Sequence, residues 1–305
     1  MSQRRHGEPL PLGGDELPYS KGMMARALIA VGVAADRAYD LARRLELDLA
    51  ERGERVVDPE RLERIARDAL GDEVGARAAA RLLRLREFQA LDVPVIILVG
   101  GGTGTGKSTV ATEVAHRLGI TRVTSTDFIR QTMRAFFSAE FMPTIHRSSF
   151  DAGEALAGDV KGDPTVAGFV EQSRLVSVGV DAAIRRALTE GWSIVLEGVH
   201  LVPGLLPPIE GALTVHCVLH IEEPDAHAAH FWIRDATSDG LRPVQRYIDA
   251  LEDIRLIQSS IVERAHRHGV PVLENRNIEW TITAVMDLVL SSVEARQGVA
   301  GGAGR

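Results

Sequence analysis

A glycine-rich loop carries the most specific chemistry in this sequence. The run Gly101-Gly-Thr-Gly-Thr-Gly-Lys-Ser-Thr109 fits the pattern G-x-x-x-x-G-K-[ST] and follows the apolar run VPVIILVG. Because glycine tolerates backbone conformations that bring amides together, such a loop can wrap a phosphate with its N–H groups. A helix beginning near Lys107 would add the positive end of its dipole. The motif therefore predicts a nucleoside triphosphate site, and a chance glycine-rich turn is the alternative.

The motif also assigns roles to single side chains. Lys107 would reach the β- and γ-phosphates, and the Ser108 hydroxyl would ligate Mg²⁺. ATP and Mg²⁺ are therefore the expected cofactors. Only three of the 35 basic residues are lysines, so a position that keeps lysine favours a need for a compact ammonium group. The expected nucleotide-binding residues are Gly102, Thr103, Gly104, Thr105, Gly106, Lys107, Ser108 and Thr109.

A second group of charged residues follows the next predicted strand. Asp127, Arg130 and Arg134 have spacings of three and seven, which place them on one face of a helix. A carboxylate there could orient and deprotonate an attacking hydroxyl, while the arginines hold an anionic acceptor. The alternative is a helix cap with an i,i+3 ion pair, which contributes little to stability.

Further candidates lie at the end of the third predicted strand and in an irregular stretch. Glu197 could hold a magnesium-bound water, contact the acceptor, or simply face solvent. His200 and His146 are candidates for substrate contact, the latter in a plausible substrate loop. His227 and His230 lie three residues apart without a nearby ligand pattern, so we expect surface or lid residues rather than a metal site.

An arginine-bearing segment after the fourth predicted strand is typical of a lid. Arg234, Arg242 and Arg246 flank the turn Ser238-Asp239-Gly240. A lid with arginines would exclude water and neutralise charge on the transferring phosphoryl group. We assign Arg234 a catalytic role and Arg242 a substrate-binding role. Since arginine is the usual cation of this chain, solvated surface residues are the alternative.

These side chains need a parallel sheet to bring them together. Apolar runs alternate with helical segments, which predicts a parallel five-stranded α/β sheet flanked by helices, with ligands at the carboxyl ends of the strands. The predicted strands lie near residues 93–100, 121–126, 192–198, 213–221 and 270–275.

A small all-α module precedes the predicted sheet. Apolar spacing, caps and glycine stops predict four helices within its bounds. The tail GVAGGAGR has no side chains that could build a core. The expected organisation is a disordered N-terminus over 1–17, the helical module over 18–91, the α/β domain over 92–296 and a disordered tail over 297–305.

Composition excludes several classes of protein. Hydrophobic residues make up 45% of the 305-residue chain and charged residues 25%, as in globular proteins. A net charge of −7 argues against broad nucleic-acid binding, and no apolar run reaches the length of a membrane span. The only cysteine, Cys217, cannot form an internal disulfide, and the start of the chain lacks a secretory pattern. We expect a cytoplasmic protein that binds a small anionic substrate, binds neither nucleic acid nor membrane, and could form a homo-oligomer.

The ordered set of motifs resembles the 2-phosphoglycerate kinases. The matching segments, over roughly residues 17–290, are GGTGTGKST, STDFIR, LEGVH-x-VPG, IRLIQ and VPVLEN. The N-terminal LPYSKGMMARALIAVG is similar to the ATP-cone segment that precedes the kinase domain in that family. The resemblance implies a P-loop kinase-type fold and transfer of the ATP γ-phosphoryl group to the 3-hydroxyl of 2-phosphoglycerate, giving 2,3-bisphosphoglycerate. It implies Lys107 and Ser108 at ATP·Mg²⁺, and Asp127 with Arg130 near the acceptor.

Other hypotheses stay open at this stage. The helical module lacks the Lys-Arg-Asp-Gly opening of ATP-cones, so a structural or dimerising role is an alternative to nucleotide binding. The chain could phosphorylate another acceptor, such as a different small metabolite or an aminoacyl-tRNA, or act as an ATP-sensing regulator without kinase activity. A DNA-binding helix-turn-helix would need a basic recognition helix, for which Arg43 and Arg44 do not suffice.

Overall fold

The chain folds into two compact units. The computed structural model describes residues 19–159, 161–237 and 244–302, so the N-terminal segment 1–17, predicted to be disordered, lies outside the described part. One unit combines the chain up to Val93 with Val114–Thr121 and with the chain from Thr283 on; the other comprises Pro94–Glu113 and Arg122–Ile282. The sequence predicts a single boundary between a helical module and an α/β domain. In the structure the chain passes between the two compact units several times.

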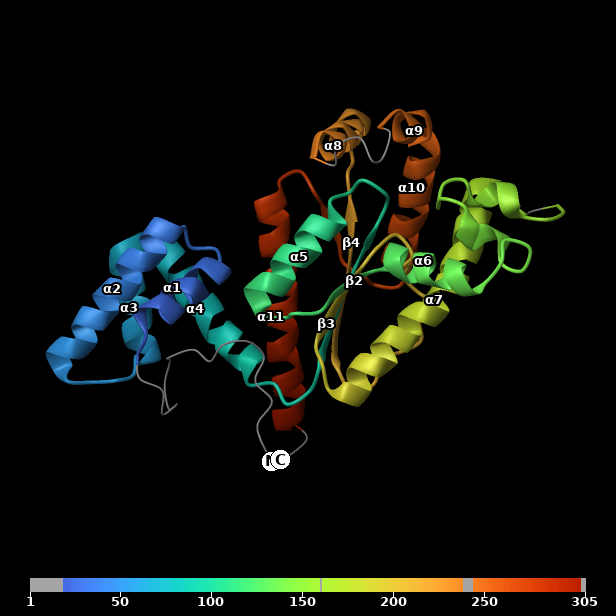
Figure 1. The fold of residues 1–305 in the computed structure, drawn as a ribbon. Helices are drawn as coiled ribbons and strands as arrows, with labels where there is room; N and C mark the ends of the chain where they lie inside the picture. Colours follow the sequence, from blue (N-terminus) through green and yellow to red (C-terminus); the bar gives the residue numbers. More distant parts are fainter. Residues whose placement is uncertain (1–18, 160, 238–243, 303–305) are drawn as a thin grey trace. The chain divides into compact units, whose positions relative to one another are not determined.

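Four helices begin the first unit (Figure 1). The Ser20 hydroxyl caps the first helix by accepting from the Met23 amide, and Asp58 caps the third by accepting from the Arg61 amide. Gly53 ends the second helix in a left-handed conformation. The helices are α1 (Lys21–Ala30), α2 (Ala35–Arg52), α3 (Pro59–Leu70) and α4 (Asp72–Gln89).

The last helix, α11 (Ile278–Gly302), contributes most of its length to this unit. Arg81 of α4 donates to both carboxylate oxygens of Asp287, at 2.8 and 2.6 Å, and Arg84 donates to Glu294 at 2.6 Å. The helical backbone continues past residue 296, where the sequence analysis begins a disordered tail. Once a helix is nucleated, each added residue gains a hydrogen bond at little further cost, so small residues can prolong it.

The second unit contains the five predicted strands, all parallel (Figure 1). Every residue of the central strand β1 is buried, which explains its uninterrupted apolar run. The order across the sheet is β2-β3-β1-β4-β5. The strands are β1 (Val95–Gly101), β2 (Val123–Ser125), β3 (Ile194–Glu197), β4 (Leu213–His220) and β5 (Val272–Glu274).

The long helix α7 (Pro164–Glu190) packs on alternate residues of the central strand. Ile96 and Leu98 of β1 share a buried cluster with Val176 and Val180 of α7. Between the strands of this unit lie α5 (Lys107–Leu118), α6 (Thr126–Phe136), the short 3₁₀ turns η1 (Pro143–His146) and η2 (Ala152–Ala155), α8 (Pro224–Thr237), α9 (Val244–Asp249) and α10 (Leu251–Arg267). In the described part of the chain, no helix combines the length and apolarity needed to cross a bilayer.

Close packing of α3 against α4 generates a stability prediction. A Cβ on Gly75 of α4 would overlap the backbone of Ala66 in α3, whereas a Cβ on Gly22 of α1 would meet nothing within 4 Å. We expect Gly75→Ala to lower the free energy of unfolding by about 1–3 kcal/mol, because overpacking outweighs the gain in helix propensity of about 1 kcal/mol. The matched control Gly22→Ala should be neutral or stabilising. Urea unfolding measures both, and equal effects would contradict the packing.

Candidate active site

The phosphate loop connects the end of β1 to the start of α5. Gly104 and Gly106 have φ values of +86° and +83°, a region that other residues rarely adopt. A Cβ on Gly104 would lie 2.5 Å from the Phe231 ring, and one on Gly106 would overlap the Asn275 amide. Both glycines are therefore required by backbone conformation and by space.

Four successive carbonyls of this loop accept hydrogen bonds from side chains. Carbonyls held in this way cannot turn toward a bound phosphate, whose oxygens they would repel, and the loop amides stay available for it. The donors are Lys107 Nζ to the Gly102 carbonyl (2.6 Å), His227 Nε2 to Thr103 (2.7 Å), His230 Nδ1 to Gly104 (3.0 Å) and Asn275 Nδ2 to Thr105 (3.0 Å).

The two predicted metal ligands lie together beneath the loop. In the register of the sheet Glu197 pairs with Val99, which places its carboxylate beside the end of the central strand. The Ser108 hydroxyl in the first turn of α5 donates to Glu197 Oε1 at 3.0 Å. Glu197 is only 7% exposed, so it does not face solvent. A buried carboxylate beside a hydroxyl is a donor pair suited to a hard cation.

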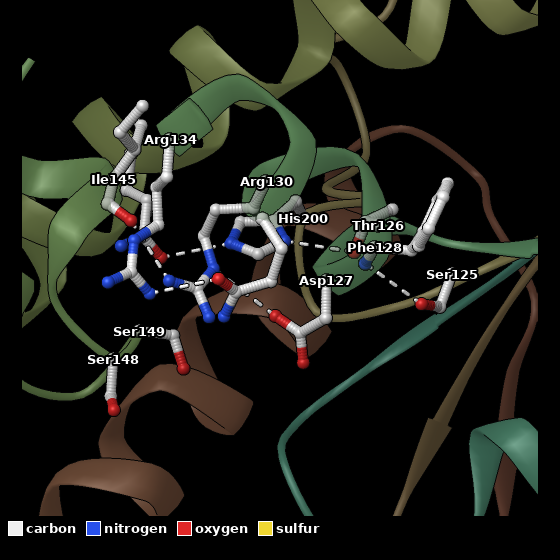
Figure 2. Close-up of polar contacts among 12 residues, drawn as sticks. Ser125, Thr126, Asp127, Phe128, Arg130, Arg134, Ile145, Ser148, Ser149 and His200 are labelled. Atoms are coloured by element: carbon white, nitrogen blue, oxygen red, sulfur yellow. Dashed lines mark hydrogen bonds and ion pairs between the residues drawn. The ribbon is translucent and has the colours of Figure 1, made fainter. Parts of the chain in front are cut away.

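Asp127 is the second residue of α6, which begins directly after β2 (Figure 2). The cap of this helix is Ser125, whose hydroxyl accepts from the Phe128 amide, so the Asp127 carboxylate is not needed as the cap. Asp127 Oδ1 accepts from Arg130 Nε at 3.3 Å, and its side chain is 58% exposed. Asp127 is thus an oriented carboxylate that solvent and ligands can reach.

The Arg130 guanidinium holds the end of the first 3₁₀ turn, η1, in place. Its Nη1 donates to the carbonyls of Ile145 at 2.9 Å and Arg147 at 3.0 Å (Figure 2). Arg134, one turn further on, donates to Gln131 in its own helix, and His146 contacts the Phe137 carbonyl at 2.9 Å. The structure therefore brings Asp127 and Arg130 together, while Arg134 and His146 make local contacts.

His200 belongs to a buried polar chain behind Asp127. Its Nε2 lies 2.9 Å from Gln172 Oε1 and its Nδ1 lies 2.9 Å from the Thr126 hydroxyl. Since the Gln172 amide nitrogen already donates to the Thr144 carbonyl at 2.5 Å, its oxygen must accept, and Nε2 of His200 carries the proton. Burial lowers the pKa of His200 to about 4. With 1% exposure, His200 acts in this structure through the residues that it holds.

The three arginines of the predicted lid segment differ in what the structure describes of them. Arg242 and the side chain of Arg234 lie outside the described part of the chain. Arg246 of α9 donates to Ser148 Oγ at 3.0 Å and to Asp151 Oδ2 at 2.5 Å. Arg246 therefore ties α9 to the segment that Arg130 also holds.

The contacts of His227, His230 and Asn275 with the phosphate loop were not predicted from the sequence. The two histidines were expected to be surface or lid residues, but His227 is fully buried and both rings contact loop carbonyls. The partners lie 124 and 126 residues away in sequence for the histidines and 170 for Asn275. The only local signal was the three-residue spacing of the histidines, which fits one helix face as well as a ligand pair.

Fold and site together define a P-loop protein of the α/β class. A phosphate loop follows the central strand of a parallel sheet, the neighbouring strand β3 ends in Glu197, and Asp127 follows β2, the next strand along the sheet. No protein-family model matches the chain.

Comparison with known sequences shows the family. A protein from Pyrococcus furiosus named 2-phosphoglycerate kinase is 40% identical over 283 residues, 92% of this chain and 93% of that protein. Proteins of the same name from Methanothermobacter thermautotrophicus and Methanopyrus kandleri are 37% and 35% identical, covering 88% and 91% of this chain and 89% and 85% of their own. The chain belongs to the 2-phosphoglycerate kinase family.

Among solved structures, the match to shikimate kinase from Acinetobacter baumannii in complex with shikimate has a TM-score of 0.38 at 13% identity. It covers 65% of this chain and 94% of that one. A likeness of this size carries no argument about the site.

Three buried histidines generate a pH prediction. Burial lowers the pKa values of His200, His216 and His227 to about 4, against 6.5 in the unfolded chain. Between these values the unfolded state binds more protons than the native state, so stability falls as the pH drops from 6.5 toward 4. Each histidine contributes on the order of 1 kcal/mol per pH unit.

The variant His200→Gln should lower the slope of stability against pH by on the order of 1 kcal/mol per pH unit, the contribution of one buried histidine. Urea unfolding at pH 7, 6 and 5 measures the slope. His266→Gln, at an exposed position of α10, should leave it unchanged. Equal slopes for wild type and His200→Gln would show that His200 is not neutral in the native state.

Proposed function

We propose that this protein is an ATP-dependent kinase that phosphorylates the 3-hydroxyl of 2-phosphoglycerate to give 2,3-bisphosphoglycerate. Its relatives named 2-phosphoglycerate kinase cover nearly the whole chain. The observation that carries the proposal is the arrangement of three side chains along one sheet edge. Ser108 and Glu197 lie 3.0 Å apart under the phosphate loop, and the exposed Asp127 follows the end of the adjacent strand.

The residues under the loop fit a magnesium ion. A serine hydroxyl and a carboxylate are hard oxygen donors, the kind that Mg²⁺ takes from a protein when nucleotide phosphates and waters complete its shell. In this proposal Ser108 would ligate the ion, and Glu197 would contact it directly or through a water. Bound there, Mg²⁺ would neutralise charge on the β- and γ-phosphate oxygens.

Lys107 would exchange one partner for another when the nucleotide binds. In the structure its ammonium donates to the Gly102 carbonyl at 2.6 Å and is only 8% exposed. A phosphate oxygen in the loop offers a negative charge in place of a neutral carbonyl, and charge-assisted hydrogen bonds are stronger. The buried ammonium would then stabilise charge on the transferring group.

Asp127 would act on the acceptor. Its carboxylate accepts the proton of the 3-hydroxyl as that oxygen bonds to the γ-phosphorus, while the bond from the γ-phosphorus to the β,γ-bridging oxygen breaks and ADP leaves. The proton then passes to solvent, which reaches this exposed carboxylate. Arg130 keeps Asp127 oriented through its Nε, and Arg134 has guanidinium donors to offer an anionic group of the acceptor.

Replacing the proposed base tests this mechanism. Asp127→Asn keeps the size of the side chain but cannot take a proton, so we expect kcat to fall by about 10²–10⁴-fold with ATP affinity unchanged. Asp159→Asn, at an exposed position between η2 and α7, is the matched control. The readout is coupled ADP release with 2-phosphoglycerate. Full activity of Asp127→Asn would rule out Asp127 as the base.

A panel of acceptors tests the substrate itself. Purified protein should release ADP with 2-phosphoglycerate in preference to other three-carbon phosphorylated acids, and mass spectrometry should find 2,3-bisphosphoglycerate. Activity with tRNA alone, or ATP binding without transfer to any acceptor, would replace the proposal by one of the other hypotheses.

Removal of the buried carboxylate tests the metal assignment. Glu197→Gln should raise the Mg²⁺ concentration for half-maximal activity by roughly 10–100-fold, because a neutral amide orients and binds the ion and its waters less well. Glu210→Gln, at an exposed position before β4, is the control. Activity is measured against Mg²⁺ at saturating ATP. An unchanged Mg²⁺ dependence would remove Glu197 from the metal site.

A further inference from the structure

Helix α8 presents two imidazoles to the phosphate loop, one turn apart. His227 Nε2 lies 2.7 Å from the Thr103 carbonyl oxygen, and His230 Nδ1 lies 3.0 Å from the Gly104 carbonyl oxygen. A carbonyl oxygen can only accept, so the ring nitrogen facing it must carry a proton in each case. The two histidines therefore donate through opposite ring atoms, Nε2 in His227 and Nδ1 in His230.

The burial of His227 makes its donor bond costly to lose. The side chain is fully buried, and its other ring nitrogen, Nδ1, has no hydrogen-bond partner. Burying a ring with one unsatisfied nitrogen costs free energy, and the hydrogen bond made by the other nitrogen offsets part of that cost. Without this donor the Thr103 carbonyl would need another partner or would turn away from its present direction.

Successive contacts between aromatic rings help to hold α8 against the loop. His227 stacks on Phe231 with ring centroids 5.5 Å apart, and Phe231 stacks on Tyr247 of α9 at 5.1 Å. Tyr247 in turn meets the edge of Phe150 at 5.9 Å. Phe231 also lies where a Cβ on Gly104 would be, so helix and loop are in van der Waals contact.

We propose that His227 and His230 are positioning residues that hold the Thr103 and Gly104 carbonyls away from the phosphate site and so preorganise the loop amides for the β- and γ-phosphates of the nucleotide. This inference rests on the proposed function for its substrate, ATP. It assigns the two histidines an effect on nucleotide binding and none on the acceptor, because both contacts are with the loop.

Amide side chains test the proposal through the opposite donor atoms. The nitrogen of glutamine reaches about as far as Nε2 of histidine, and the nitrogen of asparagine about as far as Nδ1. His227→Gln and His230→Asn therefore keep the donor, whereas His227→Asn and His230→Gln displace it. His266→Asn and His266→Gln, at an exposed position of α10, are the matched controls.

The expected result is a crossed pattern in nucleotide affinity. His227→Asn and His230→Gln should weaken ATP·Mg²⁺ binding roughly 5- to 30-fold, while His227→Gln and His230→Asn stay within about threefold of wild type. Calorimetric binding of ATP·Mg²⁺ without acceptor and the KM for ATP should agree. The KM for 2-phosphoglycerate should not change in any variant, and circular dichroism checks the fold.

Several outcomes would overturn the inference. These are equal effects of both amides at each position, a change in the KM of the acceptor in place of that of ATP, or unchanged nucleotide affinity in all four variants. If the His227 variants fail to fold, the His230 pair alone decides. Absence of transfer to 2-phosphoglycerate in wild type would refute the proposed function, yet calorimetry with ATP·Mg²⁺ would still show or refute the crossed pattern.

Discussion

The direction of the carbonyl groups in the phosphate loop is the constraint on which the site depends. A loop that binds phosphate must turn its amides inward, and its carbonyls then need other partners. Here those partners come from distant parts of the unit: α8 supplies two imidazoles, and Asn275 at the end of β5 supplies an amide. Thr281 holds Asn275 in turn through a bond of 2.8 Å to its Oδ1. The loop geometry is therefore a property of the folded unit rather than of the motif alone.

On the acceptor side the reactive group is exposed, and buried residues hold it in place. The accessible carboxylate is that of Asp127. Asp127 is exposed, but the residues behind it are buried and fully engaged. His200 joins Thr126 to Gln172, and Gly198 leaves no room for a Cβ against Thr126. Arg130 of α6 donates hydrogen bonds to the carbonyls of Ile145 and Arg147 and so holds that segment against α6. A buried network that satisfies its polar groups fixes one arrangement, so a reactive carboxylate can sit at its surface without being mobile.

The parts of this protein that the sequence predicts are those encoded by local pattern. Five apolar runs gave the five strands, and the glycine pattern located the loop between β1 and α5. The pairing of Ser108 with Glu197 also follows, because parallel strands bring their carboxyl ends to one edge. The contacts of His227 and His230 could not be predicted, since they depend on how α8 packs across more than a hundred residues. No local pattern marks the passage of the chain between the two compact units, because α11 crosses between them within one continuous helix.

The scarcity of lysine gains a physical explanation at one position. Lys107 is 8% exposed and bonds the Gly102 carbonyl at 2.6 Å, whereas Lys21 lies half-exposed beside Glu46 at 3.6 Å and Lys161 is exposed. An arginine at position 107 would bring a planar group with five N–H donors into a space already occupied by the loop backbone. Donors left without acceptors there would cost about 1–3 kcal/mol each, more for a charged group. Burial thus selects the compact ammonium at position 107. The exposed Lys21 and Lys161 are under no such constraint, so their being lysines is no evidence for a second nucleotide site.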